Sequence, residues 1–126
     1  SPAWMFTREA KEDDVVNGHA IAKGQVMMFS PYITHHLPEF WPEPDRFDPD
    51  RFLPAAEATR PKTAYMPFSL GPRMCIGNIF ALVESCLMLV TIMQEGKLLP
   101  VGGMSLKPQL GVVLRPSNKM QMRFEM

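Results

Sequence analysis

Prolines crowd the middle of this chain and restrict the structures that it can form there. The 126 residues include 13 prolines, which are dense between 31 and 61. Proline fixes φ and has no amide hydrogen, so this segment cannot hold a long helix or a central strand. The stretch 40–52 nevertheless carries four aromatic residues and two arginines. We therefore expect an ordered, packed meander over 31–67; the alternative is a surface loop of polyproline character.

One long helix is expected after the meander, in the segment 78–95. Apolar residues follow the i, i+3, i+4 spacing of a helix from Asn78 to Met93, namely Ile79, Leu82, Val83, Cys86, Leu87, Val90 and Met93. Other apolar residues widen this face, so we expect the helix to be largely buried and Cys86 to lie in the core. Gly96 is expected to cap its C-terminus.

Short β-strands are expected on both sides of these segments. Asn17-Gly18 lies between apolar residues and predicts a hairpin in the 1–30 segment, because both turn positions need a positive φ. A short, mostly buried strand is expected over 25–30. β-Hairpins are expected in 96–126, with short strands at 98–99, 111–114 and 119–124.

Charge and composition exclude several classes of protein. Lysine plus arginine and aspartate plus glutamate both number 13, so the net charge is zero. A nucleic-acid-binding protein needs a basic excess, so nucleic acid is not an expected partner. No apolar run reaches the ~18 residues of a membrane span, so no membrane segment is expected. The two cysteines are too few for a disulfide scaffold, which favours a reducing compartment. We expect a cytoplasmic location, with a membrane-anchored parent protein as the alternative.

The stretch 68–77 carries the residues that point to chemistry. Cys75 comes just before the predicted helix, whose N-terminal amides and partial positive charge favour a thiolate over a thiol. Gly77 has no side chain, so a flat ligand could approach the backbone closely. Arg73 could pair with a carboxylate of that ligand, and Phe68 supplies an aromatic wall. This combination fits a haem that is held by an axial cysteine.

The spacing of these residues distinguishes this interpretation from simpler ones. An isolated cysteine is more often a small buried residue. The five residues of F-x-x-G-x-R-x-C-x-G would occur by chance in about one in 10⁴ to 10⁵ chains of this length. His35 and His36 could suggest a metal site, but adjacent residues face different ways and no further ligands have zinc spacing.

This stretch resembles the cysteine-ligand loop of the cytochrome P450 superfamily, the haem-thiolate monooxygenases. Ala81 and Glu84 are similar to the family's continuation C-x-G-x-x-x-A-x-x-E. The segment 47–52 resembles its F-x-P-x-R-F motif, and 32–41 its Y-x-x-H-R-x-x-x-x-W motif with His36 in place of arginine. The segment 3–8 is similar to the strand that passes over the haem.

The resemblance implies a haem b site and a role for each matching residue. Cys75 would be the catalytic residue and the metal ligand, as the proximal thiolate on the haem iron. Phe68 would pack against this thiolate, and Arg73 and Arg8 would hold the haem propionates. The other haem-binding residues implied are Gly71, Ile76, Gly77 and Ala81.

Further positions would shape the substrate pocket and the supporting structure. The resemblance implies a substrate-lining role for Ala3, Trp4, Met5, Phe6 and Val112. Arg51 would complete the salt-bridge network of the family's E-x-x-R helix, and Phe47 and Phe52 are the other structural residues of the meander. Glu43-x-x-Arg46 also spells this motif, but Pro44 interrupts it, so we do not take it as the family's helix.

The fold class implied is α+β, mostly α in the full family, with residues 1–126 as the C-terminal portion of a single domain. The implied function is insertion of one atom of O₂ into an apolar organic substrate. Electrons would come from a ferredoxin or a flavoprotein reductase docked on the proximal face near Cys75.

The family's own E-x-x-R helix and its distal helix would precede Ser1. We therefore expect this chain to be an incomplete, inactive fragment. One alternative is a truncated or degenerate relative that acts as a non-catalytic binding module. Another is a chance match in a structural domain, which predicts no haem binding.

Overall fold

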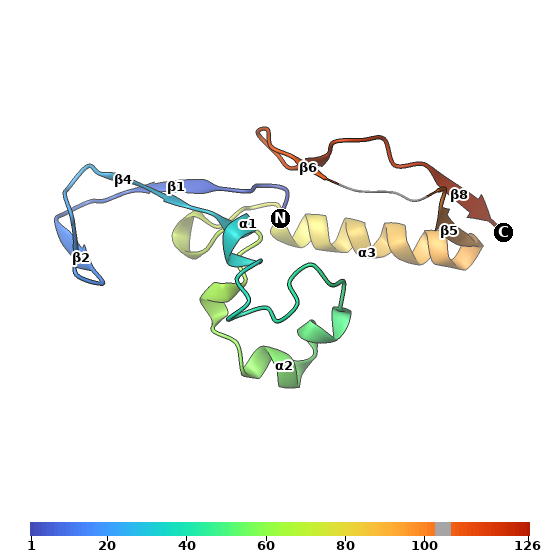
Figure 1. Cartoon of the computed structure of the whole chain (residues 1–126), viewed down its shortest axis with the longest axis horizontal. Helices are drawn as coiled ribbons and strands as arrows, with labels where there is room; N and C mark the ends of the chain where they lie inside the picture. Colours follow the sequence, from blue (N-terminus) through green and yellow to red (C-terminus); the bar gives the residue numbers. More distant parts are fainter. Residues whose placement is uncertain (103–106) are drawn as a thin grey trace. The chain divides into compact units, whose positions relative to one another are not determined.

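The chain forms two compact units, residues 1–70 and residues 71–126. A computed structural model describes residues 1–102 and 107–126 (Figure 1). The positions 103–106, inside the segment predicted to form C-terminal hairpins, lie outside the described residues. The boundary between the units falls inside the predicted ligand loop 68–77, so each unit is described by itself.

The first unit begins with two pairs of antiparallel strands. β1 (Phe6–Glu9) pairs with β4 (Val26–Phe29), and β2 (Asp14–Val16) pairs with β3 (His19–Ile21). Asn17 and Gly18 both have a positive φ, at 49° and 81°, so the predicted hairpin is present. The expectation of a mostly buried strand over 25–30 is wrong, because only one strand pairs with β4 and three of its four residues are exposed.

The meander contains four short helical turns, three of which start at a proline. They are α1 (Pro31–Thr34), α2 (Pro54–Ala58) and the 3₁₀ helices η1 (Pro49–Phe52) and η2 (Lys62–Ala64). Three of them have proline at the first position, where no amide hydrogen bond is lost. The absence of a long helix here follows the prediction from proline content.

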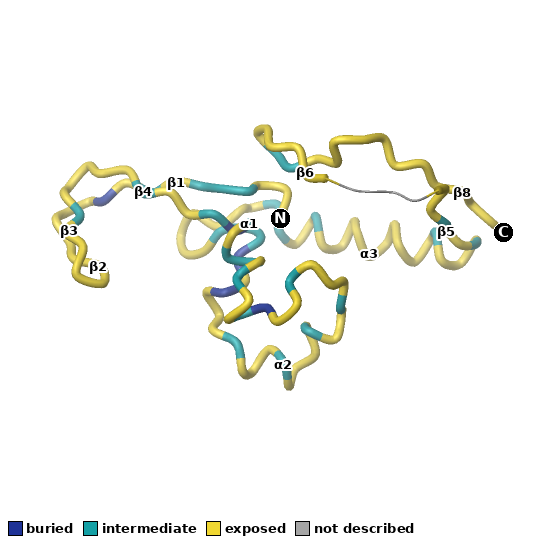
Figure 2. Tube along the Cα trace, in the orientation of Figure 1, coloured by how far each residue is buried: buried dark blue, intermediate teal, exposed yellow. Residues whose placement is uncertain are grey.

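The core of this unit lies in the meander. The buried residues of the described chain are Ala10, Pro31, Trp41, Ala64 and Met66 (Figure 2). The Trp41 ring is 5% exposed and lies 5.8 Å from the ring of Tyr65 and 6.0 Å from that of Phe52. This packing is that of an ordered segment and not of a solvated polyproline loop; the bounds 31–67 of the meander stay a prediction.

The second unit contains the long helix and four short strands. A 3₁₀ turn η3 (Gly71–Arg73) precedes α3 (Asn78–Glu95). β5 (Lys97–Pro100) pairs antiparallel with β8 (Met122–Glu125), and β6 (Pro108–Gln109) pairs with β7 (Arg115–Pro116). The expected strand at 111–114 is wrong, because these residues form the bend that joins β6 to β7 and pair with no strand.

α3 has the predicted length, but its predicted burial is wrong. None of its residues is buried, and Cys86, expected in the core, is exposed. Within the described part of its own unit, β5 is the element that packs against the helix, and it follows the C-terminal end. The apolar periodicity identified the helix correctly, but burial also requires a partner along that face.

Gly96 ends α3 as predicted, but a left-handed backbone is not the reason that glycine is needed here. Its φ of 167° is extended, a conformation open to any residue. A Cβ at this position would collide with the carbonyl oxygen of Glu125 and lie 2.9 Å from the Phe124 ring. The close approach of β8 therefore requires glycine.

By length and composition, α3 also meets the criteria of a membrane-spanning helix. It has 18 residues with a mean hydropathy of 1.3, whereas the sequence analysis expected no membrane segment. Core helices of soluble proteins meet the same criteria, and Glu84 near its middle would be costly in hydrocarbon.

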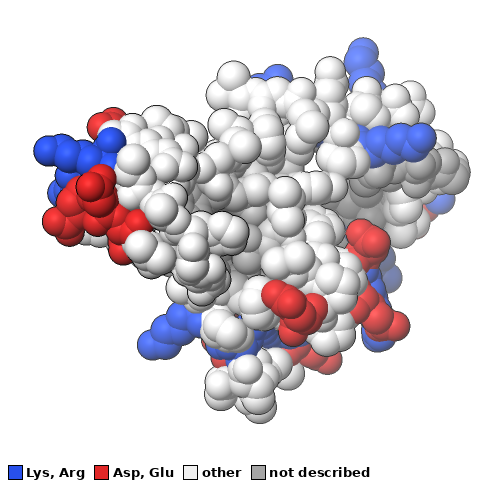
Figure 3. All heavy atoms as spheres, turned by 60° about the vertical axis from the view of Figure 1, so that its left-hand side comes forward, with Lys and Arg blue, Asp and Glu red and all other residues white. Residues whose placement is uncertain are grey.

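Charged side chains form no large field of one sign on the view in Figure 3. Lysine, arginine, aspartate and glutamate gather there in small groups with uncharged surface between them. Two ion pairs join described residues, Arg46 with Glu43 and Arg123 with Glu125. Both are solvent-exposed, so each contributes about 0–1 kcal/mol to stability.

Candidate functional site

A tight turn leads the chain into the cysteine loop. Gly71 has a φ of 74° and starts η3, and the Met74 amide donates to the Gly71 carbonyl at 3.0 Å. Only glycine adopts this backbone conformation without strain. This requirement accounts for Gly71 in the motif independently of any contact with a ligand.

Cys75 presents an exposed thiol beside a glycine that leaves space open. A Cβ added at Gly77 would meet one neighbouring atom within 4 Å, the Cys75 Sγ at 3.9 Å. Gly77 is also the N-cap of α3 and has no side chain to accept from the first amides. The sulfur therefore lies next to backbone that a flat group could approach closely.

Other side chains of this loop are available for binding. Arg73 is exposed, and no hydrogen bond or ion pair joins its side chain to the rest of the described chain. Ile76 is 102% exposed, so a large apolar side chain next to the thiol is uncovered. Ala81 is half-buried at the start of α3. A group with apolar faces and a carboxylate edge would match these features.

Arg8 and Phe68 belong to the other unit. The Arg8 guanidinium donates to the Ser69 hydroxyl at 2.6 Å and to the Thr7 carbonyl at 2.8 Å. It also lies 4.7 Å from the centre of the Phe6 ring. Phe68 is half-buried. Ser69 was not singled out from sequence, although its place inside the motif next to Phe68 could have indicated it.

The residues predicted to line a substrate pocket are divided between the units. Ala3 is exposed, whereas Trp4, Met5 and Phe6 are half-buried in the strand region of the first unit. The Phe6 ring stacks on that of Phe29 at 5.4 Å. Val112 is 97% exposed in the second unit, where it lines a surface hollow of about 370 Å³. Their shared role stays a prediction.

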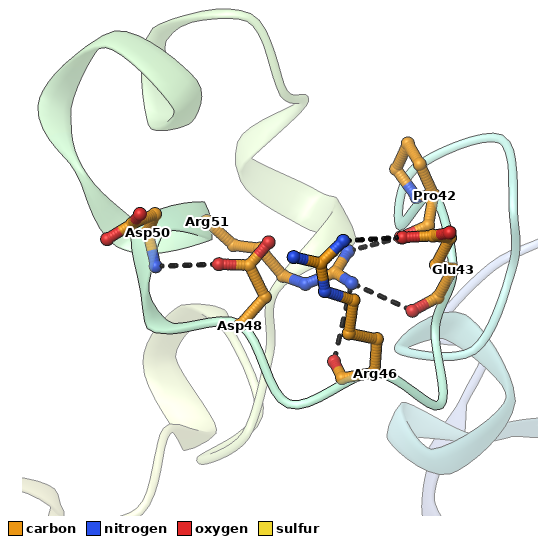
Figure 4. Close-up of polar contacts among 6 residues, drawn as sticks. All are labelled: Pro42, Glu43, Arg46, Asp48, Asp50 and Arg51. Atoms are coloured by element: carbon orange, nitrogen blue, oxygen red, sulfur yellow. Dashed lines mark hydrogen bonds and ion pairs between the residues drawn. The ribbon is translucent and has the colours of Figure 1, made fainter.

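The side chain of Arg51 holds the meander together by hydrogen bonds to backbone carbonyls (Figure 4). Its guanidinium donates to the carbonyls of Pro42, Glu43 and Arg46, the last two at 2.8 and 3.3 Å. Glu43 has a φ of 51° and pairs with Arg46 at the surface, so Glu43-x-x-Arg46 is not helical, as the sequence analysis inferred.

The two phenylalanines of the F-x-P-x-R-F motif have different environments. Phe52 lies 5.0 Å from Tyr65, ring to ring, and contacts the Trp41 cluster. Phe47 is 92% exposed and takes no part in this packing. The structural role expected of Phe47 therefore stays a prediction.

Arg60 is a residue that the sequence analysis missed. Its guanidinium lies 3.9 Å from the centre of the Trp41 ring and 5.6 Å from that of Phe52, and it donates to the Arg51 carbonyl. Cation–π contacts of this kind stabilise by about 0.5–2 kcal/mol. No sequence pattern distinguishes Arg60 from the other arginines of the meander.

His35 is a second missed residue. The Met66 amide donates to its Nε2 at 3.0 Å, and its ring contacts those of Trp41 and Tyr65. Burial lowers the pKa of His35 to about 4, with smaller contributions from the positive charges of the N-terminal amino group and His36. His35 is therefore neutral at pH 7.

The chain resembles proteins whose names indicate one family. The family model for cytochrome P450 matches residues 1–124. A putative cytochrome P450 132 from Mycobacterium tuberculosis is 40% identical over 118 residues, which cover 94% of this chain and 25% of that protein. Cyclooctat-9-en-7-ol 5-monooxygenase from Streptomyces melanosporofaciens is 35% identical over 105 residues, covering 83% of this chain and 23% of the enzyme.

A solved structure has the same fold as this chain. The haem domain of cytochrome P450DA matches with a TM-score of 0.86 and 32% identity, covering 98% of this chain and 28% of that chain. The chain thus spans about a quarter of the length of the curated relatives that it matches.

Proposed function

Because the chain belongs to the cytochrome P450 family, we propose that it forms the haem-ligating part of a haem-thiolate monooxygenase. One observation carries this proposal. Within F-x-x-G-x-R-x-C-x-G, the exposed Cys75 thiol lies 3.9 Å from the position that a Cβ of Gly77 would fill. The sulfur thus has free space beside it, so Cys75 would be able to hold the iron of a flat haem group.

The residues of the cysteine loop fit this cofactor. Cys75 would hold the iron through its sulfur, and the apolar surface of Ile76 and Ala81 would cover part of the porphyrin face. Arg73, whose side chain makes no hydrogen bond or ion pair within the described chain, would pair with a propionate. Bound haem supplies the redox chemistry that activates O₂, and the thiolate donates electron density that favours O–O cleavage.

Arg8, in strand β1, would bind the second propionate. Its bond to Ser69 and its contact with the Phe6 ring hold the guanidinium in one orientation. A guanidinium that is already ordered loses less entropy when it binds a carboxylate.

The substrate class and partners follow from the family and are proposals for this chain. We propose an apolar small-molecule substrate that binds in a pocket lined in part by Trp4, Met5 and Phe6. Electrons would come from a ferredoxin or a flavoprotein reductase that docks near Cys75, in the cytoplasm. The chain covers about a quarter of its relatives, so we expect no turnover from residues 1–126 alone; monooxygenation by this segment would contradict that expectation.

The test compares the two cysteines in the whole protein that contains this chain. Cys75→Ser and Cys86→Ser are each loaded with haem, reduced and exposed to carbon monoxide. We expect the red-shifted Soret band of a thiolate-ligated complex in wild type and in Cys86→Ser, and its loss in Cys75→Ser. A band that survives in Cys75→Ser would overturn the assignment. Absence of haem binding in the folded wild type would favour the non-catalytic binding module.

A further inference from the structure

We propose that His35 and Trp41 are positioning residues that anchor the chain where it enters the cysteine loop, and that protonation of His35 breaks one of the two hydrogen bonds of this anchor. The proposal rests on the proposed function only in assigning Cys75 as the haem ligand. The anchor consists of two hydrogen bonds from the start of the meander to the segment 64–66, which we call the 64–66 clasp. Residues 68–77 follow this segment almost immediately in the sequence.

Both bonds of the clasp join residues far apart in the chain. The Met66 amide donates to His35 Nε2 at 3.0 Å across 31 residues. The Trp41 Nε1–H donates to the Ala64 carbonyl at 3.2 Å across 23 residues. Ala64 is 2% exposed and Met66 is 8% exposed. A broken bond would therefore leave a backbone group without a partner in a place that water reaches poorly.

The direction of one bond makes the clasp sensitive to protons. A backbone amide can only donate, so His35 Nε2 must accept, and the imidazole must be neutral with its proton on Nδ1. A second proton on Nε2 would place two donors against each other. Trp41 Nε1–H does not titrate, so acid removes one of the two bonds and leaves the other.

The groups around His35 do not compensate for a positive charge on its ring. Its ring lies 5.2 Å from the Tyr65 ring and 5.9 Å from the Trp41 ring, centre to centre. A surface hollow that it lines also contains Arg46, Asp48 and Arg51, two cations and one carboxylate. His36, the next residue in the chain, and the N-terminal amino group of Ser1 also oppose its protonation.

Asp48, the carboxylate of that hollow, is engaged elsewhere. It accepts from the Asp50 amide at 3.1 Å as the cap of η1. No hydrogen bond or ion pair joins His35 to Asp48 among the described residues that line this hollow.

The sign of the pH effect follows from the lowered pKa of His35. Between pH 6.5 and about 4, His35 binds a proton when its hydrogen bond to the Met66 amide is broken (the open state) but not when that bond is formed (the closed state). Opening therefore becomes more favourable as the pH falls through this range, by at most about tenfold per pH unit. Because His35 is only half-buried, we expect a smaller factor, about threefold per unit.

Three variants of the whole haem-loaded protein distinguish the effect of protonating His35 from the effect of losing its hydrogen bond. His35→Gln keeps an acceptor near the Nε2 position and does not titrate in this range. His35→Phe keeps a ring in the aromatic cluster and removes the acceptor. His36→Gln is the control for loss of a titratable imidazole, because His36 is exposed and its described side-chain contacts are with Tyr32, whose carbonyl lies 2.6 Å from Nδ1 and whose ring lies 4.5 Å from the imidazole. Since His36 itself opposes protonation of His35, we expect this variant to differ from wild type by at most a small shift to higher pH.

The first measurement is the protection factor of the Met66 amide in hydrogen exchange, from pH 7 to pH 4.5. We expect protection to fall with acid in wild type and in His36→Gln, to stay constant in His35→Gln, and to be low at every pH in His35→Phe. An acid profile in His35→Gln that equals the wild-type profile would overturn the proposal, as would full protection in His35→Phe.

The second measurement is the thiolate Soret band of the ferrous–carbon monoxide complex over the same pH range. We expect its acid loss to shift to lower pH in His35→Gln relative to wild type and His36→Gln. An unshifted loss would show that the clasp does not position the cysteine loop. If wild type lacks this band at pH 7, the proposed function fails, while the exchange of the Met66 amide still tests the clasp.

Discussion

Replacing Arg60 by methionine should destabilise the meander far more than the same change at Arg46. Methionine keeps much of the length and apolar contact of the Arg60 side chain but removes its charge. The change deletes a charged hydrogen bond to the Arg51 carbonyl, about 1.5–3 kcal/mol, and the cation–π contact with Trp41 at 3.9 Å, about 0.5–2 kcal/mol. We expect a total loss of about 2–5 kcal/mol.

The control differs in what the guanidinium contacts. Arg46 pairs with Glu43 at 3.0 Å, and the two side chains are 65% and 69% exposed. An exposed pair of this kind contributes about 0–1 kcal/mol, so Arg46→Met should be close to neutral. Both arginines lie in the same unit and carry the same charge, which cancels general effects of removing a cation.

Hydrogen exchange of the Ala64 amide is the measurement, because this amide is buried and donates to the Pro61 carbonyl at 2.9 Å. In the whole protein, Arg60→Met should raise its exchange rate about 30-fold or more, since 1.4 kcal/mol corresponds to a factor of ten. If the two variants lie within about 1 kcal/mol of each other, the contacts of Arg60 do not hold the meander.

Three further substitutions test other parts of the structure, each by equilibrium urea unfolding of the whole protein. Gly96→Ala should lower the free energy of unfolding by about 1–3 kcal/mol, because the added Cβ collides with strand β8; an unchanged midpoint would contradict this packing. Ser69→Ala should cost about 1 kcal/mol, because the Arg8 guanidinium loses a hydrogen bond of 2.6 Å; Ser69→Asn, which keeps an oxygen acceptor and tolerates the φ of 66° at this position, should restore part of it. Gly18→Ala should cost about 1 kcal/mol through its φ of 81° alone, since no atom lies within 4 Å of the new Cβ; a larger loss would indicate a contact that the structure lacks.

Local features of the fold were predictable because their causes lie within a few residues. The Asn17-Gly18 turn needs two positive φ angles, and that pair of residues supplies them. Prolines at 31, 49 and 54 each begin a short helical turn. The helix 78–95 was visible as a period in the apolar residues.

Burial was not predictable, because it depends on what lies opposite a residue. Cys86 sits on the apolar stripe of α3 and yet is exposed. Periodicity identifies the face of a helix that can be buried, and a partner must then cover it. The same limit applies to β4, where three of the four apolar residues are exposed.

Parts of the candidate site were visible only as a motif, and others not at all. The spacing of Phe68, Arg73, Cys75 and Gly77 was enough to indicate the cysteine loop. His35 and Arg60 act on atoms that lie nine to 31 residues away in sequence. For Arg60, neither residue type nor spacing is unusual, so the sequence carries no sign of its contacts; His35 matches the histidine of the 32–41 motif, but the motif does not show which atom its ring contacts.

The residues of the 64–66 clasp are all present once the chain has been synthesised as far as Met66. Protein chains are made from the N-terminus, and contacts within a short stretch form before contacts that need later residues. The aromatic cluster around Trp41 and both hydrogen bonds of the clasp lie between His35 and Met66. The anchor can therefore form during translation before Cys75 and α3 emerge. The cysteine loop then follows residues 64–66, whose position is already fixed.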